Sequence, residues 1–159
     1  MISILILTHG GMADELLDSA RMVAGPLENF SALSLPWSDG QPEVQAKLEE
    51  RLASMANDSG ILILTDFFGG TPSNAAMPMR APGEVEVVSG VNLPMVVRLG
   101  CLSKKMTMDL DELAHYIRDK GRKSICCGTD LPAVGPKLAT PQDPCAEDEI
   151  DPSAPAEPG

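Results

Sequence analysis

Short apolar runs alternate with amphipathic segments along most of the chain. Residues 2–9 and Ile61–Thr65 are apolar almost throughout, a pattern typical of strands that are covered on both faces. Phe30–Leu35 has more polar positions, which predicts a strand near an edge of the sheet. Val85–Ser89 predicts a further strand, and residues 123–127 are a candidate for a last short one.

Between these runs, apolar residues recur at intervals of three and four, which predicts helices. The helices are expected at about residues 13–24, 42–56, 71–77, 94–102 and 109–120. Pro78 and Pro82 should shorten the third helix, and Gly121 should end the last one. Because strands and helices alternate, the sequence predicts an α/β fold. We expect a doubly wound, mainly parallel sheet of four to five strands with helices on both faces, a three-layer sandwich.

Composition changes this picture only at the end of the chain. Six acids and no basic residue lie between 141 and 159, and they supply −6 of the formal net charge of −11. We therefore expect one domain over residues 1–130 and a disordered, acidic, proline-rich tail over 131–159. Nucleic-acid binding is not expected, because it requires clustered positive charge.

The chain also carries no pattern that predicts export or a membrane. The apolar start has no basic segment before it, and no stretch approaches the roughly 20 apolar residues of a membrane span. The four cysteines include no Cys-x-x-Cys pair, so we expect thiols in a reducing cytoplasm rather than a disulfide framework.

Two polar residues stand where apolar strands are expected to end, His9 and Asp66. Ligands of an open parallel sheet bind beyond the carboxyl ends of its strands, so we expect these side chains to meet there. A carboxylate on one ring N–H would leave the other ring nitrogen with its lone pair. Gly69-Gly70-Thr71 leads into a helix whose amides favour an anion. A histidine nucleophile, an orienting acid and an anion site suggest phosphoryl transfer.

Other interpretations of the same residues remain. His9 alone could be structural or solvated, and Asp66 could simply form a turn. A receiver-like domain phosphorylated on Asp66 would need Mg²⁺ and several acidic ligands, whereas the first strand ends in a histidine. A binding module without turnover would also use an anion site. His115 falls on the polar side of a helix, and we interpret it as solvated surface.

Three motifs carry a family resemblance. They are Thr8-His9-Gly10, then Leu-Thr-Asp-Phe-Phe-Gly-Gly-Thr-Pro-Ser-Asn-Ala-Ala at residues 64–76, and Gly-Val-Asn-Leu-Pro-Met at residues 90–95. In order and spacing the chain resembles the IIA components of the mannose family of the sugar phosphotransferase system (PTS). The resemblance implies that His9 is phosphorylated and that Asp66 is its hydrogen-bonding partner. It further implies contacts to the phosphoryl group from Gly10, Gly69, Gly70 and Thr71, and a site wall formed by Asn92, Leu93 and Pro94.

The resemblance also implies partners. A phosphotransferase of this family takes the phosphoryl group from the histidine-phosphorylated carrier HPr and passes it to a IIB component, without metal or cofactor. It is cytoplasmic and usually a homodimer, with a last strand that pairs at the partner's edge. The alternative is a regulatory sensor that uses the same phosphorylation to bind a kinase or a transcription regulator.

Overall fold

Four parallel strands form the sheet in the computed structural model, which describes residues 1–102 and 107–130. The strands are β1 (Ser3–His9), β2 (Phe30–Leu35), β3 (Ile61–Thr65) and β4 (Val85–Ser89), in the order β2-β1-β3-β4. The expected tail lies outside the described residues, so the division of the chain at residue 130 stays a prediction. The α/β fold and the edge position of β2 are confirmed.

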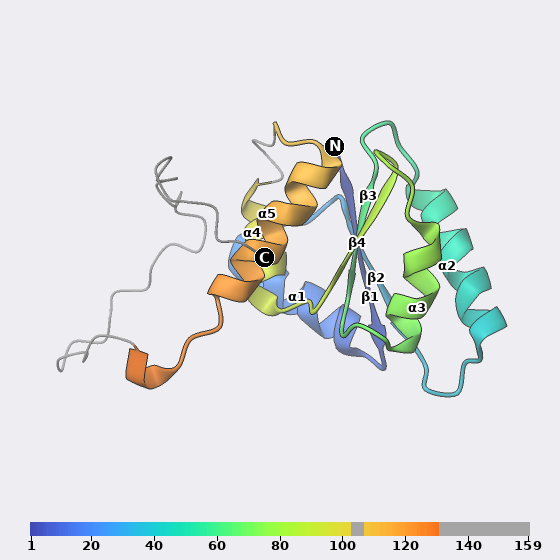
Figure 1. Ribbon diagram of the computed structural model, residues 1–159, viewed down its shortest axis with the longest axis horizontal. Helices are drawn as coiled ribbons and strands as arrows, with labels where there is room; N and C mark the ends of the chain where they lie inside the picture. Colours follow the sequence, from blue (N-terminus) through green and yellow to red (C-terminus); the bar gives the residue numbers. More distant parts are fainter. Residues whose placement is uncertain (103–106, 131–159) are drawn as a thin grey trace.

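Helices cover both faces of this sheet, so the three-layer arrangement is also confirmed. Figure 1 looks along the sheet, with α1, α4 and α5 on one side and α2 and α3 on the other. The helices are α1 (Met12–Ala24), α2 (Gln41–Met55), α3 (Thr71–Ala76), α4 (Leu93–Leu102) and α5 (Leu110–Lys123). Two short 3₁₀ helices follow α3 and α5, η1 (Met77–Met79) and η2 (Gly128–Asp130). Pro78 lies in η1, where the α-helical pattern ends as expected.

The alternation of side chains along β1 explains why its sequence is apolar throughout. Ile4 and Ile6 join the core with α1, α4 and α5, whereas Leu5 and Leu7 join the core with α2. All four side chains are buried, because successive residues of a strand point to opposite faces and both faces carry helices. The central strands are therefore fixed from both sides, and their carboxyl ends are held firmly in place.

The end of α5 differs from the sequence-based expectation. Gly121 does not end this helix, which continues to Lys123, and residues 123–127 do not form a strand. A Cβ atom at Gly121 would lie 2.5 Å from the Sδ atom of Met95 in α4. The glycine thus serves the close packing of two helices, and the sequence pattern alone does not distinguish this from a helix stop.

Two further sequence-based expectations concern cysteines and membranes. Cys126 and Cys127 are free thiols, but Cys101 is disulfide-bonded, so the expectation of thiols is wrong at that position. Within residues 1–102 and 107–130, no helix has both the length and the apolar character needed to cross a bilayer.

Candidate active site

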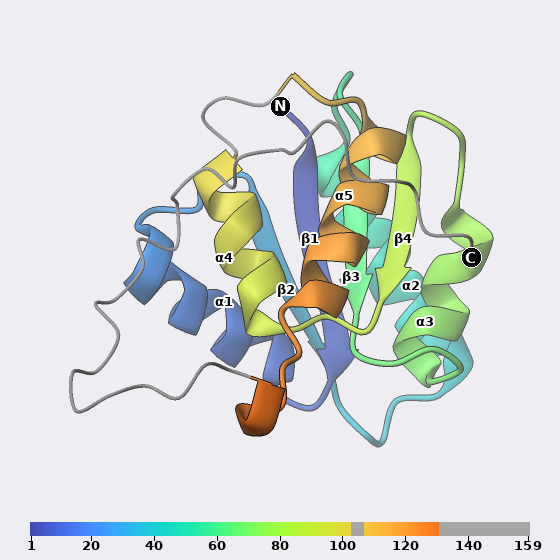
Figure 2. The same ribbon diagram turned by 60° about the vertical axis from the view of Figure 1, so that its left-hand side comes forward.

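His9 and Asp66 meet between β1 and β3, at the point of the sheet where the order of the strands reverses. β1 pairs with β2 on one side and with β3 on the other, and the carboxyl ends of β1 and β3 lie next to each other (Figure 2). Such a switch point forms a crevice, because the connections that follow the two strands lead to opposite sides. His9 is the last residue of β1, and Asp66 directly follows β3.

The Asp66 carboxylate binds both the backbone and the ring of His9. Its Oδ2 atom lies 2.7 Å from Nδ1 of the imidazole and accepts the backbone N–H of His9 at 2.9 Å. The Oδ1 atom accepts the backbone N–H of Phe67 at 2.9 Å. A carboxylate can only accept, so the neutral ring carries its proton on Nδ1 and leaves the lone pair on Nε2. Nε2 is therefore the nucleophilic atom of this pair.

Electrostatics keep Asp66 ionised. Burial raises the pKa of its carboxyl group, but hydrogen bonds from His9 and from the Phe67 amide outweigh burial, and the net pKa is lowered. Both oxygens are engaged by donors, which makes Asp66 an orienting group rather than a free nucleophile. This geometry disfavours the receiver-like interpretation, in which Asp66 itself would be phosphorylated.

The lowered pKa of Asp66 predicts that the difference in unfolding free energy between the wild type and Asp66→Asn depends on pH. The ionised carboxylate stabilises the fold above the ordinary aspartate pKa of about 3.9, and this contribution is lost as the pH falls through the lowered pKa of the folded state. Urea unfolding of the wild type and of Asp66→Asn should give a gap in unfolding free energy that is constant above about pH 5 and shrinks below pH 4. A gap that stays constant down to pH 2 would contradict this.

Two aromatic side chains stack on the imidazole of His9. The Trp37 ring stacks at a centroid distance of 4.6 Å and an angle of 14°, and the Phe67 ring stacks at 5.2 Å and 16°. The His9 side chain is 12% exposed, whereas Trp37 is 78% exposed. Trp37 belongs to none of the motifs by which the sequence predicts the site. The available signal was its position two residues after Phe30–Leu35, at the same edge of the sheet as His9.

Gly70 lies beside the ring and leaves no room for a side chain. A Cβ atom there would stand 2.8 Å from Cε1 of His9 and 2.8 Å from Cζ of Phe67. Gly10 and Gly69 have positive φ values of 55° and 90°, a region that other residues rarely adopt. Glycine is thus required at position 70 for close approach, and at positions 10 and 69 for backbone conformation.

Gly70→Ala should displace the His9 ring, because the new Cβ atom would stand 2.8 Å from Cε1, and the ring can move away only by weakening its contacts with Asp66 and its stacking partners. We expect phosphoryl uptake to slow about 10- to 100-fold, the usual cost of misplacing a reacting group by about an ångström. Rapid-quench measurement of uptake rates would check this. Gly11→Ala is the matched control, since a Cβ atom at Gly11 meets nothing within 4 Å. Equal rates for Gly70→Ala and Gly11→Ala would contradict the steric argument.

The loop that follows Asp66 is only partly free to bind an anion. The Gly69 amide donates to Oγ of Ser73 at 2.8 Å, and the Gly70 amide donates to the Phe67 carbonyl at 3.4 Å. Within the described part of the chain, the amide and hydroxyl of Thr71 have no hydrogen-bond partner. Thr71 is the first residue of α3, and Gly70 rather than Thr71 takes the N-cap position.

Asn92 lies in the turn after the carboxyl end of β4, and Leu93 and Pro94 are the first two residues of α4. The turn is tied to the sheet because the Gly90 and Val91 amides donate to the Thr65 carbonyl. The Asn92 side chain caps α4 through the Met95 amide, and its Nδ2 atom donates to the Gly121 carbonyl in α5. These contacts hold two helices together, and the role of the turn as a site wall stays a prediction.

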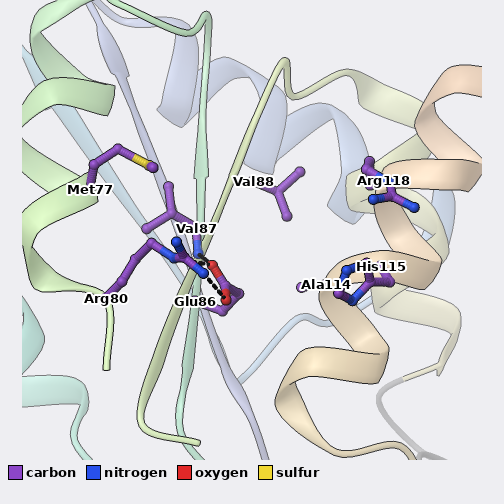
Figure 3. A pocket seen from close by; sticks show the side chains of 8 residues that line it. All are labelled: Met77, Arg80, Glu86, Val87, Val88, Ala114, His115 and Arg118. Atoms are coloured by element: carbon purple, nitrogen blue, oxygen red, sulfur yellow. Dashed lines mark hydrogen bonds and ion pairs between the residues drawn. The ribbon is translucent and has the colours of Figure 1, made fainter. Parts of the chain in front are cut away.

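A separate pocket of about 270 Å³ lies beside β4 and contains none of the predicted site residues. Figure 3 shows that its lining side chains come from η1 and the residue after it, from β4 and from α5. Arg80 donates to both carboxylate oxygens of Glu86, at 2.7 and 2.9 Å. His115 is exposed on α5, as expected, and lines this pocket.

Comparisons with known proteins agree on one family. Residues 3–118 match the EIIA-man family model, described as "PTS system fructose IIA component". The chain is 30% identical to the fructose-specific EIIA component of the PTS of Bacillus subtilis over 152 residues, which cover 94% of this chain and 100% of that protein. It is 33% identical to the mannose-specific EIIAB component of Escherichia coli over 125 residues, 78% of this chain and 38% of that protein.

A solved structure extends the agreement to the fold. The mannose/sorbose-specific IIA subunit of the phosphotransferase system from Enterococcus faecalis superimposes with a TM-score of 0.74 at 32% identity, over 84% of this chain and 98% of that one. Each of these matches is a IIA component of the PTS or contains one.

The chain therefore belongs to the EIIA-man family of PTS IIA components, the mannose-type family that its motifs resemble. The chain spans about two fifths of the length of the mannose-specific relatives that it matches, of which 38% is covered.

Proposed function

We propose that His9 carries the phosphoryl group on Nε2, and that it receives the group from phosphorylated HPr and passes it to a histidine of a IIB component. The 2.7 Å contact between Asp66 Oδ2 and Nδ1 of His9 is the observation that carries this proposal. It directs the lone pair to Nε2 and balances the positive charge that the ring gains on attack.

The transfer is an in-line displacement at phosphorus. The Nε2 lone pair forms the new N–P bond while the N–P bond of the donor phosphohistidine breaks, and the electron pair of that bond stays on the donor imidazole. The His9 ring then carries a positive charge next to the Asp66 carboxylate. Positioning and charge stabilisation supply the catalysis, since phosphoryl transfer needs little covalent help from the protein. The step as written uses no metal or cofactor.

We propose that the phosphoryl oxygens lie between the Gly10 turn and the loop of Gly69, Gly70 and Thr71. The unpartnered amide and hydroxyl of Thr71 support this, because both are donors at the start of α3. Asn92, Leu93 and Pro94 would close the site from the β4 side. Their position at the carboxyl end of the neighbouring strand supports this role.

We also propose a homodimer that works in the cytoplasm, where phosphorylated HPr would reach it. The outer edge of β4 supports self-association, because no strand of the described residues pairs along it. All five residues of β4 are only partly buried, whereas those of β3 are fully buried. An unpaired strand edge is a ready site for pairing with another chain.

Transfer of labelled phosphate from phosphorylated HPr to the purified protein tests the proposal. We expect stoichiometric labelling, with a phosphate that is lost in acid and stable in alkali, the behaviour of a phosphohistidine. Addition of a IIB component should remove the label. An alkali-labile phosphate would identify an acyl phosphate and reject His9. The absence of any uptake from HPr would reject the phosphocarrier proposal for this chain.

A further inference from the structure

The groups around the His9 ring restrict how the ring can react. Trp37 and Phe67 both stack on the ring, and Nδ1 is hydrogen-bonded to Asp66. Gly70 lies beside Cε1 so closely that a Cβ atom would be 2.8 Å away. Nε2 is the ring nitrogen that is left for an incoming group. Trp37 comes from the loop between β2 and α2, so a third segment of the chain contributes to the site beside those of His9 and Asp66.

We infer that Trp37 is a positioning residue, which clamps the His9 imidazole against Phe67 so that Nε2 faces the phosphoryl donor. The inference rests on the proposed phosphorylation of His9. Ring centroids at 4.6 and 5.2 Å and nearly parallel planes are the geometry of favourable aromatic stacking. The single hydrogen bond that the ring donates to Asp66 would leave the ring free to tilt about the Nδ1 contact, and stacking against two aromatic rings opposes this.

The clamp also stabilises the positive charge that the His9 ring gains during attack. Attack by Nε2 leaves the His9 ring positively charged, and the faces of aromatic rings attract a cation, tryptophan most strongly. The stabilisation appears only as the charge develops, so it lowers the barrier rather than strengthening the binding of the donor. Loss of the indole should therefore slow the transfer step about 3- to 30-fold, which corresponds to the usual strength of such contacts.

Trp37 is an accessible target for a test, because it is largely exposed and its removal leaves no hole in the core. Trp37→Leu removes the aromatic face and keeps an apolar side chain, and Trp37→Phe restores a ring. Phe68→Leu is the matched control, since Phe68 is 76% exposed on the same loop as Phe67, and its ring is not one of the two that stack on His9. Thermal unfolding confirms that each variant is folded.

Proton NMR gives a readout that does not depend on phosphorylation. The chain has two histidines, and His115 is exposed on α5. Ring currents from two stacked aromatic rings should move the Hε1 signal of His9 upfield of that of His115. Trp37→Leu should shift the His9 signal back towards His115, and Trp37→Phe should restore part of the upfield position. A His9 signal that is the same in the wild type and in Trp37→Leu would overturn the clamp.

Rates of uptake from phosphorylated HPr test the effect on reactivity. At saturating HPr we expect about 3- to 30-fold slower transfer for Trp37→Leu, recovery in Trp37→Phe, and no change in Phe68→Leu. A rise in KM for HPr with an unchanged maximal rate would overturn the inference and make Trp37 a docking residue. If the wild type takes up no phosphoryl group, the proposed function fails, and the NMR shift alone then decides whether Trp37 holds the ring.

Discussion

His9→Ala is expected to take up no phosphoryl group from phosphorylated HPr. The substitution removes the only ring nitrogen that the site orients, because Asp66 fixes Nδ1 and leaves Nε2 as the nucleophile. The overall fold should survive, since the backbone amide of His9 still donates to Asp66 and the strand below it is buried on both faces. Incubation with labelled donor, followed by electrophoresis under alkaline conditions, measures the remaining label.

His115→Ala is the matched control for this experiment. His115 is the second histidine of the chain, and it lies on the exposed face of α5, where its Nδ1 atom is 2.8 Å from the Asp111 carbonyl. Its removal should leave phosphoryl uptake at the wild-type level. Label that persists in His9→Ala and disappears in His115→Ala would transfer the proposed role from one histidine to the other.

Asp66→Asn is expected to slow phosphoryl uptake by roughly 10²- to 10⁴-fold, the range seen when a carboxylate that orients a catalytic histidine is made neutral. An asparagine side chain has one acceptor oxygen, whereas Asp66 accepts three N–H groups through two oxygens. The amide NH₂ group then faces either the Phe67 amide, in the place of Oδ1, or both donors of His9, in the place of Oδ2. The preference for the Nδ1–H tautomer weakens, and the positive ring after attack has no counter-charge. Single-turnover rates at saturating phosphorylated HPr measure the effect.

Asp119→Asn is a suitable control for the removal of one negative charge. Asp119 lies on α5 and pairs with Arg118 at 2.8 Å, and about half of its side chain is exposed. Its substitution should leave the single-turnover rate unchanged. A rate for Asp66→Asn within about threefold of the wild type would mean that Asp66 shapes the loop without orienting the histidine.

The sequence was sufficient to predict the sheet and the central pair of the site. Apolar runs that end in a polar residue define β1 and β3, and their parallel arrangement brings His9 and Asp66 together without further information. The pattern was also sufficient to place Phe30–Leu35 at an edge. Local periodicity determines these features, because burial on one or both faces is encoded in the residues of the strand itself.

Features that depend on contacts between distant segments were not predictable. The stacking of Trp37 on His9 joins residues from different loops, and no local pattern reports it. Gly121 resembles a helix stop, yet its place is set by Met95 in another helix. Likewise, the motif that contains Asn92 gave no sign that its amide group would also bind α5. Each case needs the packing of two elements before the role of the residue can be recognised.

The proposed mechanism depends most on which nitrogen of the His9 ring receives phosphorus. Long-range ¹H–¹⁵N correlation spectra of the ¹⁵N-labelled protein, recorded before and after phosphorylation by HPr, distinguish the two nitrogens of the His9 ring. We predict that phosphorus is bound to Nε2, and that Nδ1 keeps its proton on Asp66 in both states. Phosphorus on Nδ1, or a His9 ring that stays unchanged while the protein carries phosphate, would contradict the account.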